Sequence, residues 1–136
     1  MPNYWVLKTE PTAYSYDNLV KDGGTYWDGV KNPVALKNMR SMKKGDQALI
    51  YHTGKEKSAI GIAKITSDPY PDPALKNEKM VVFDLKAVKR LKRPVTLAEI
   101  KADATFKEMA LVRQGRLSVV SATKRQWDKL LKMGSS

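Results

Sequence analysis

The sequence has 136 residues, the usual size of one domain, and 42% of them are hydrophobic, enough for a core of its own. Its formal net charge is +11 and its isoelectric point is about 9.8, a balance typical of proteins that bind a polyanion. The absence of cysteine excludes disulfides, thiolate metal sites and thiol nucleophiles. No apolar stretch reaches the roughly 18 residues of a membrane span. We therefore expect a cytoplasmic or otherwise intracellular protein, nuclear in a eukaryote, that binds nucleic acid and not a membrane.

The N-terminal third predicts one strand and two helices. Aromatic and β-branched residues make residues 4–8 a strand, and a serine cap followed by a glycine pair predicts a short helix over residues 15–21. Asn32 followed by Pro33 is a cap plus a first-turn proline, so it begins a second helix. The segment around Trp27 between these helices has neither periodicity and is predicted to be a loop.

The middle of the sequence is dominated by strand patterns. A turn at residues 44–46 precedes strands over 48–53 and 60–66, which we expect to pair as a hairpin. Three prolines between residues 69 and 73 predict an extended loop. Residues 80–91 alternate between apolar and polar side chains and predict a long strand.

Helix caps and one closing strand mark the C-terminal third. Thr96 with Glu99 is a capping-box pattern, and Asp103 is a candidate cap for a further helix. Residues 117–120 predict a closing strand. A second capping box, formed by a threonine and a glutamine, opens a final helix that ends before the glycine at position 134.

These elements predict a single domain over residues 1–133 and a flexible tail at 134–136. Strands are interspersed with short helices without regular βαβ alternation. This pattern favours the α+β class, with a mixed, partly closed sheet or pseudo-barrel and peripheral short helices. We expect the domain to be a monomer.

The sequence offers little catalytic chemistry. His52 is the only histidine, so a nucleophile activated by imidazole would have to depend on it. It falls inside a predicted strand, where a structural role is favoured. The acidic residues are scattered, and no phosphate-binding glycine loop is present. We therefore expect no catalytic residues, no metal and no cofactor, with a carboxylate-dependent nucleotide hydrolase or nuclease as the alternative.

Four stretches together resemble a known family: YWVLKTEP at 4–11, WDGVKN at 27–32, the segment 44–53, and RQGRLSV at 113–119. In order and spacing they are similar to the EVE domain, a member of the PUA-like superfamily related to YTH domains. The resemblance extends from about residue 3 to residue 131. It implies a PUA-like pseudo-barrel that takes a flipped, modified base, such as a modified cytosine in DNA, into an aromatic pocket. An RNA-binding module of the same superfamily is the alternative to DNA.

Trp27 is the residue on which this hypothesis depends. A tryptophan in a loop either fills the core or forms a platform on which a base stacks. The residues alone favour the core, and the resemblance favours the platform. Trp5 and Trp127 fall in strand and helix patterns, so we expect both in the core.

The resemblance also implies two sets of contacts to nucleic acid. The base-binding set is Lys8, Thr9, Glu10, Trp27, Gly29, Val30, Asn32, Tyr51, Thr53, Met109, Arg116, Leu117 and Ser118. The set that contacts the nucleic-acid backbone is Lys31, Lys37, Arg40 and Arg113.

Several members of the base-binding set have two possible roles. Glu10 is expected to accept from an exocyclic amine and Lys8 to donate to a ring acceptor or a phosphate, with a surface salt bridge between them as the alternative. Asn32 either caps its helix or offers its amide to the base edge. Met39 and Met109 either form an adaptable wall for a methyl group or fill the core.

Strand alternation orders the remaining side chains. Tyr51 and Thr53 share one face of their strand, and His52 points the other way. Arg116 and Ser118 are likewise expected to share a face of the closing strand.

Overall fold

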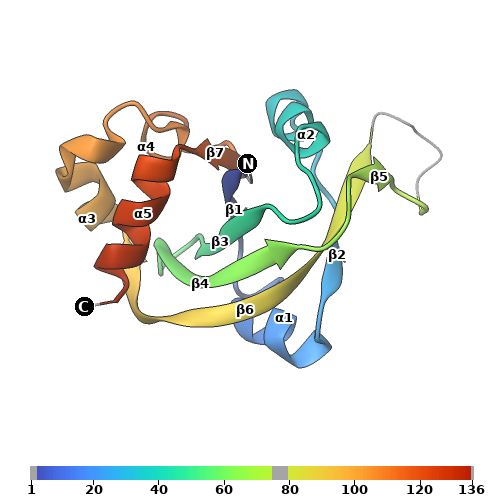
Figure 1. Cartoon of the computed structure of the whole chain (residues 1–136), viewed down its shortest axis with the longest axis horizontal. Coiled ribbons are helices and arrows are strands. Elements are labelled where there is room, and N and C mark those ends of the chain that lie inside the picture. Colours follow the sequence, from blue (N-terminus) through green and yellow to red (C-terminus); the bar gives the residue numbers. More distant parts are fainter. Residues whose placement is uncertain (1–2, 75–79, 136) are drawn as a thin grey trace.

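The computed structural model describes residues 3–74 and 80–135 (Figure 1). Its centre is one seven-stranded sheet in the order β2-β6-β4-β3-β1-β7, with β5 paired to β6 outside this path. The pair β1–β3 is parallel, and the other pairs are antiparallel. The strands are β1 Tyr4–Thr9, β2 Thr25–Trp27, β3 Gln47–His52, β4 Ser58–Ile65, β5 Tyr70–Pro71, β6 Val81–Thr96 and β7 Val119–Ala122.

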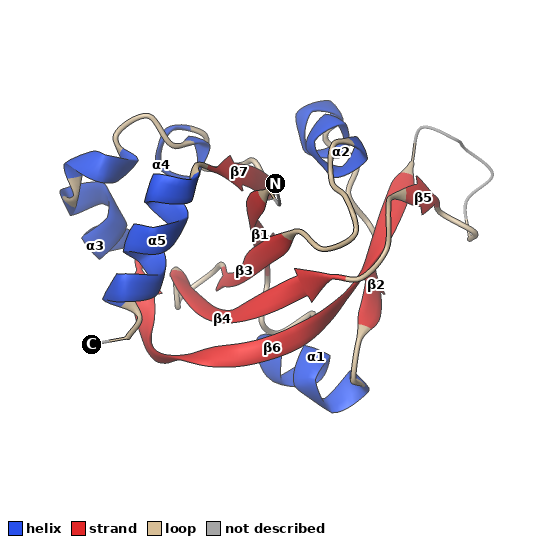
Figure 2. Ribbon diagram, viewed as in Figure 1, coloured by secondary structure: helices blue, strands red, loops and turns tan. Residues whose placement is uncertain are grey.

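The sheet curls into a half-barrel, and short helices lie around it (Figure 2). The register shifts between strands β3, β4 and β6 are the irregularities that bend it. Helices α3, α4 and α5 gather at one end of the sheet, while α1 and α2 lie apart from them (Figure 2). The helices are α1 Tyr16–Asp22, α2 Pro33–Arg40, α3 Leu97–Ala102, the 3₁₀ turn η1 Ala104–Phe106, α4 Ala110–Arg113 and α5 Lys124–Met133.

The predicted helix starts are confirmed because each depends on a local cap. Ser15 begins α1, and Asn32 begins α2 by accepting hydrogen bonds from two backbone amides. Thr96 and Thr123 close the predicted capping boxes with Glu99 and Gln126. Asp103 caps the 3₁₀ turn η1 rather than an α-helix.

The segment around Trp27 differs from the prediction. Residues 25–27 form strand β2, in which Thr25 pairs with Leu85 and Trp27 pairs with Phe83. Flanking glycines predict a loop, but the pairing partners lie almost 60 residues later and leave no local signal. The pairing turns alternate side chains to opposite faces, so Trp27 is buried while Tyr26 is 43% exposed.

Other boundaries also move. β6 extends to residue 96, and β5 forms within the predicted proline loop. The closing strand begins at Val119, so Arg116 and Ser118 lie in the turn before it and do not share a strand face. At the chain end, Gly134 is held by hydrogen bonds, since its amide donates to Leu130 and its carbonyl accepts from Arg93 at 3.2 Å.

The hydrophobic core lies inside the curl of the sheet. Trp5 and Trp127 are 4% and 3% exposed, which confirms their predicted place in the core. The ring of Tyr4 stacks on Trp127 with centroids 4.9 Å apart. The indole Nε1 of Trp5 donates to the buried carboxylate of Asp46 at 3.0 Å, so the tryptophan is buried with its polar atom satisfied.

Helix α1 is fixed to the sheet through Tyr16. The Tyr16 hydroxyl donates to the carbonyl of Ile62 at 2.8 Å, and its amide donates to Nε2 of His52 at 3.0 Å. A Cβ at Gly61 would lie 2.4 Å from the Tyr16 ring, so only glycine allows this approach. Because α1 is held in this way, the segment that links it to β1 and β2 has a defined position.

Arg93 and Glu99 form an ion pair whose loss on acidification we expect to measure. Hydrogen bonding with Arg93, followed by that with the Thr96 backbone, lowers the pKa of Glu99 to about 2 from its ordinary 4.5. The pKa is lower in the folded state than in the unfolded state. The contribution to stability is therefore present above pH 4.5 and is lost as pH falls from about 4.5 to about 2.

The measurement is the free energy of unfolding of the wild type and Glu99→Gln by urea titration across that pH range. The wild type should be the more stable protein at neutral pH, and the difference should vanish near pH 2. A difference that stays constant with pH would contradict this assignment.

Candidate nucleic-acid interface

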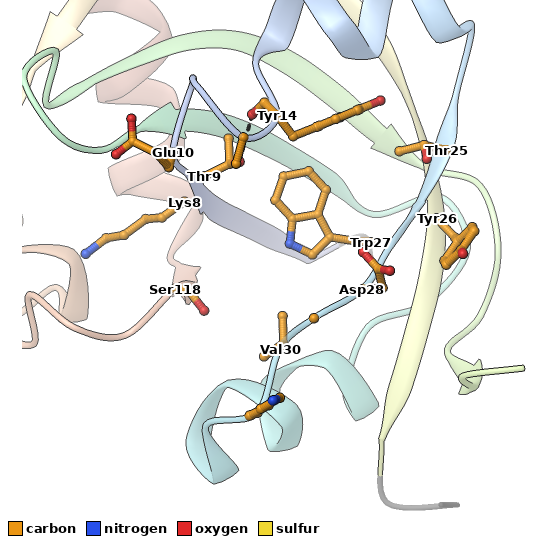
Figure 3. Close-up of a pocket in the computed structure, with 13 residues that line it drawn as sticks. Lys8, Thr9, Glu10, Tyr14, Thr25, Tyr26, Trp27, Asp28, Val30 and Ser118 are labelled. Atoms are coloured by element: carbon orange, nitrogen blue, oxygen red, sulfur yellow. Dashed lines mark hydrogen bonds between the residues drawn. The ribbon is translucent and has the colours of Figure 1, made fainter. Parts of the chain in front are cut away.

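The end of β1, the loop after it and the segment that begins at β2 enclose a cavity of about 550 Å³ (Figure 3). This volume is in the range of ligand-binding clefts. The lining residues are Lys8, Thr9, Glu10, Ala13, Tyr14, Thr25, Tyr26, Trp27, Asp28, Gly29, Val30, Lys31 and Ser118.

Trp27 is the largest aromatic side chain among the residues that line this cavity. Its side chain points from β2 into the space bounded by Tyr14, Val30 and Ser118 (Figure 3). The indole is 8% exposed, and the Tyr14 ring meets it edge-on, with centroids 6.4 Å apart and an interplanar angle of 85°. The tryptophan is thus packed on one side and borders the cavity on another.

Tyr14 is held in place by groups on both sides of it. Its hydroxyl donates to Asp22 at 2.8 Å, and its carbonyl accepts from the Thr9 hydroxyl at 2.7 Å. Burial, followed by the hydrogen bond to Asp22, raises the pKa of Tyr14 to about 12. The phenol therefore keeps its proton at neutral pH and supports the indole as a fixed, neutral ring.

The end of β1 brings Lys8 and Ser118 together. The Lys8 amide donates to the carbonyl of Ser118 at 2.9 Å, and its ammonium donates to the carbonyl of Gly115 at 2.9 Å. Burial lowers the pKa of Lys8. A half-buried ammonium with only a carbonyl as its hydrogen-bond partner gains from an incoming anion.

Two carboxylates border the cavity from different sides. Glu10 accepts from the hydroxyls of Thr12 at 3.3 Å and Thr53 at 3.4 Å, so it does not form the alternative salt bridge with Lys8. Figure 3 shows Glu10 and Lys8 on the β1 side, pointing away from the indole, whereas Asp28 lies beside the β2 backbone directly after Trp27. Among residues 3–74 and 80–135, Asp28 forms no ion pair or side-chain hydrogen bond, so its oxygens are available to a ligand.

Over half of the base-binding set suggested by sequence lies around this one cavity. The members of the set that line this cavity come from three separate stretches of the chain. They are Lys8, Thr9, Glu10, Trp27, Gly29, Val30 and Ser118. Lys31, assigned to the nucleic-acid backbone, also lines the cavity.

The other members of that set lie elsewhere. Met109 and Leu117 are core residues, 2% and 5% exposed, because both pack into the apolar interior. Tyr51 and Thr53 line a separate, smaller cavity, and Arg116 lies in the exposed turn before β7.

Asn32 and Met39 each have a structural role, one in a helix cap and the other in the core. The side-chain oxygen of Asn32 accepts from the amides of Val34 and Ala35 at 2.9 and 3.1 Å, so this oxygen caps α2. Met39 is fully buried and fills the core.

Sequence reasoning missed five lining residues: Ala13, Tyr14, Thr25, Tyr26 and Asp28. Tyr14 follows a turn in which the amides of Ala13 and Tyr14 both donate to the carbonyl of Glu10 at 2.9 Å. Pro11 in the sequence was a signal for this turn, but it did not indicate where the tyrosine points. Asp28 follows Trp27 directly in the sequence, so of the five missed residues it had the clearest sequence signal.

The residues assigned to backbone contacts are spread over several elements. Lys37 and Arg40 lie in the last turn of α2, on its exposed surface. Arg113 lies at the end of α4, where it forms an ion pair with Glu108.

His52 has a structural role, as its strand position favoured. It is 5% exposed, and its Nε2 accepts the Tyr16 amide while its Nδ1 lies 3.1 Å from Glu56 Oε1. Since Nε2 is an acceptor, the ring proton is on Nδ1 and bonds to the glutamate. Within the described ranges, no group of three or more histidine, aspartate or glutamate residues has the geometry to hold a metal ion.

Comparison with known proteins places the chain in a family. A family model described as the EVE domain matches residues 3–133. The chain belongs to the EVE domain family. Rat thymocyte nuclear protein 1 is 30% identical to it, in an alignment that covers 98% of this chain and 74% of the relative.

Solved EVE-domain structures have the same fold. A protein of Rhodopseudomonas palustris solved by NMR is 43% identical, with a TM-score of 0.92 and coverage of 97% of this chain and 92% of that one. Human THYN1 in complex with DNA containing 5-methylcytosine is 30% identical, with a TM-score of 0.89 and 98% coverage of both chains. The expected PUA-like α+β fold is confirmed. None of the described helices is both long and apolar enough to span a bilayer.

Proposed function

We propose that this EVE domain binds DNA by taking one extruded base, a modified cytosine, into the cavity beside Trp27, and that it does so as a monomer without catalysis. The observation that carries the proposal is an indole that borders an open cavity of about 550 Å³ on a protein of net charge +11. The similarity to THYN1, solved with 5-methylcytosine-containing DNA, supports the choice of base.

Stacking supplies the affinity for the base. An aromatic side chain contributes about 1–3 kcal/mol per stacked base, whatever the identity of that base. Trp27 is fixed by strand pairing with Phe83 and by the edge of Tyr14. It is therefore ordered before the base arrives, which reduces the entropy lost on binding.

Polar groups at the rim supply the discrimination. The exocyclic amine of cytosine is a donor, and the two cavity carboxylates, Glu10 and Asp28, are its candidate acceptors. We favour Asp28 because it lines the cavity directly after Trp27 in the chain and has no partner among the described residues. A methyl group resting on Val30 adds about 0.8 kcal/mol, roughly a fourfold preference.

The basic surface offsets the cost of extrusion. Unstacking and unpairing one base in a duplex costs a few kcal/mol. Lysine contacts to phosphates release counterions, which strengthens binding at low salt. We expect DNA to bind more tightly than RNA, and in a eukaryotic cell such a protein would act in the nucleus.

A binding panel tests the function. Matched DNA and RNA oligonucleotides carrying either cytosine or 5-methylcytosine at one position are titrated by fluorescence anisotropy at two salt concentrations. The account predicts the tightest binding for modified DNA and a steep loss of affinity with salt. Equal affinity for modified and unmodified DNA would contradict the choice of base, and tighter binding of RNA would favour the RNA-binding alternative.

A further inference from the structure

A second cavity of about 160 Å³ lies between the ends of β1 and β3 and the helices α3 and α4. Lysine is its most frequent lining residue. The residues that line it are Lys8, Tyr51, Thr53, Gly54, Lys57, Leu97, Lys101, Leu111, Val112 and Gly115.

The lysines of this cavity are not neutralised by the protein. Among the residues that the structure describes, Lys57 and Lys101 form no ion pair. Lys8 donates to a backbone carbonyl and lies over the Tyr51 ring, 5.8 Å from its centroid, but has no carboxylate partner. By contrast, Arg93 and Lys124 elsewhere each have a carboxylate partner. Three lysines without a carboxylate partner make the surroundings of this cavity positive, which favours the entry of an anion.

The backbone at Lys57 is held in an uncommon conformation. Lys57 has φ of 42°, and it is the only described residue other than glycine with positive φ. Its carbonyl accepts the Leu97 amide at 2.7 Å, which fixes the loop against the start of α3. Such a conformation costs free energy and persists where the surroundings impose it. The backbone position from which the Lys57 side chain extends is therefore fixed beside the cavity.

The size and the chemistry of the cavity suit a phosphate group. At about 30 Å³ per water, the volume has room for roughly five water molecules, which is enough space for a phosphate group. Lys57, from the loop after β3, and Lys101, from α3, line the cavity and can supply charged donors. Burial lowers the pKa of Lys8, so its charge is stabilised by an anion close to it.

The two cavities adjoin. Lys8 lines both of them. A hydrogen bond also joins their linings. Thr53, which lines the small cavity, donates its hydroxyl to Glu10, which lines the large cavity, at 3.4 Å. A nucleotide whose base enters the large cavity therefore has a phosphate within reach of the small one.

We infer that the small cavity is a phosphate subsite, in which Lys57 and Lys101 bind the backbone phosphodiester next to the extruded base. This inference rests on the function proposed above and assigns a role to residues outside the base-binding set. It also explains how one base is selected for entry, since the backbone on one side of it is anchored.

The test compares the wild type with the Lys57→Asn, Lys101→Gln double variant on a duplex that carries one 5-methylcytosine. Asparagine tolerates positive φ, so the loop is preserved, and Lys101→Gln alone serves as a second variant. We expect the double variant to bind about tenfold more weakly, with the slope of log affinity against log salt reduced by about 1. The ratio of affinities for modified and unmodified DNA should stay unchanged.

A backbone scan locates the phosphate. Each phosphodiester flanking the modified base is replaced in turn by an uncharged methylphosphonate. One position should weaken the wild type about tenfold and the double variant less than about twofold, because the same contact is removed twice. A Lys21→Gln, Lys64→Gln variant has the same charge, with both changes at exposed positions outside the two cavities, and should behave as the wild type in this scan.

Two results would overturn the inference. One is a double variant with wild-type affinity and salt slope. The other is a scan in which no methylphosphonate position is coupled to the two lysines. This result would overturn the inference even if inorganic phosphate, titrated into the free protein, shifts the amide resonances of Lys57 and Lys101. The cavity would then bind free phosphate and not the DNA backbone. Failure of the proposed function is seen separately, as equal affinity of the wild type for modified and unmodified DNA.

Discussion

Trp27→Ala is expected to weaken binding of 5-methylcytosine-containing DNA by about 1–3 kcal/mol, a loss of about fivefold to 150-fold. The indole is the largest aromatic side chain among the residues that line the cavity, so its removal takes away the proposed stacking partner of the base. Because stacking does not depend on base identity, affinity for the unmodified duplex should fall as well wherever that base is extruded. The measurement is the dissociation constant by calorimetry or anisotropy.

Two control variants separate stacking from stability. Trp27→Phe retains an aromatic ring and should recover part of the lost affinity. Leu131→Ala truncates a half-buried side chain on α5, away from the cavity, and should lower the melting temperature without changing the affinity. Wild-type affinity in a folded Trp27→Ala protein would show that the indole does not contact the base.

The second large effect is on stability. Asp46→Ala is expected to lower the free energy of unfolding by about 3 kcal/mol, because each buried donor left without a partner costs roughly 1–3 kcal/mol. Asp46 is 2% exposed and accepts from Trp5 Nε1, the Asn3 amide and the Lys43 amide, each at 3.0 Å. Its carboxylate therefore joins the first strand to the turn before β3.

Urea denaturation measures this loss, with Asp68→Ala as the matched control. Asp68 is exposed and accepts a hydrogen bond from the Lys44 amide at 2.9 Å, so its loss should cost less than about 1 kcal/mol. Asp46→Asn retains one acceptor oxygen and should fall between the two alanine variants. An Asp46→Ala protein as stable as Asp68→Ala would contradict the role of this carboxylate.

Most helices and the main strands were predictable because their signals are local. The caps at Ser15, Asn32, Thr96 and Thr123 each satisfy backbone amides within three residues, so the sequence alone places the helix starts. Strand alternation over residues 80–91 likewise predicted most of β6.

The predictions that were wrong concern elements whose pairing partners lie far away in the sequence. Strand β2 exists because Thr25–Trp27 pair with residues 83–85 of β6. Arg116 and Ser118 were expected on one strand face, but the pairing of β7 with β1 begins only at Val119. Local propensity carries no information about either partner.

The candidate site was predictable in part for the same reason. Two of the motif stretches, Lys8 to Glu10 and Trp27 to Val30, supply part of the cavity lining, and the sheet brings them to one place. Tyr14 and Asp28 complete it by the direction of their side chains, which only the three-dimensional structure gives. The cavity around Lys57 and Lys101 assembles from four separate stretches of the chain, at residue 8 and at residues 51–57, 97–101 and 111–115, and no spacing in the sequence indicates it.

Direct observation of the indole in the complex tests the central idea, that a base stacks on Trp27. The measurement is an NMR titration that follows the Trp27 ring protons on addition of a duplex containing 5-methylcytosine, with intermolecular NOEs recorded to the base. The account predicts large ring-current shifts at Trp27 and NOEs from its ring to the methyl group of that base. Saturated binding with unshifted Trp27 resonances, and shifts confined to the exposed lysines, would contradict it.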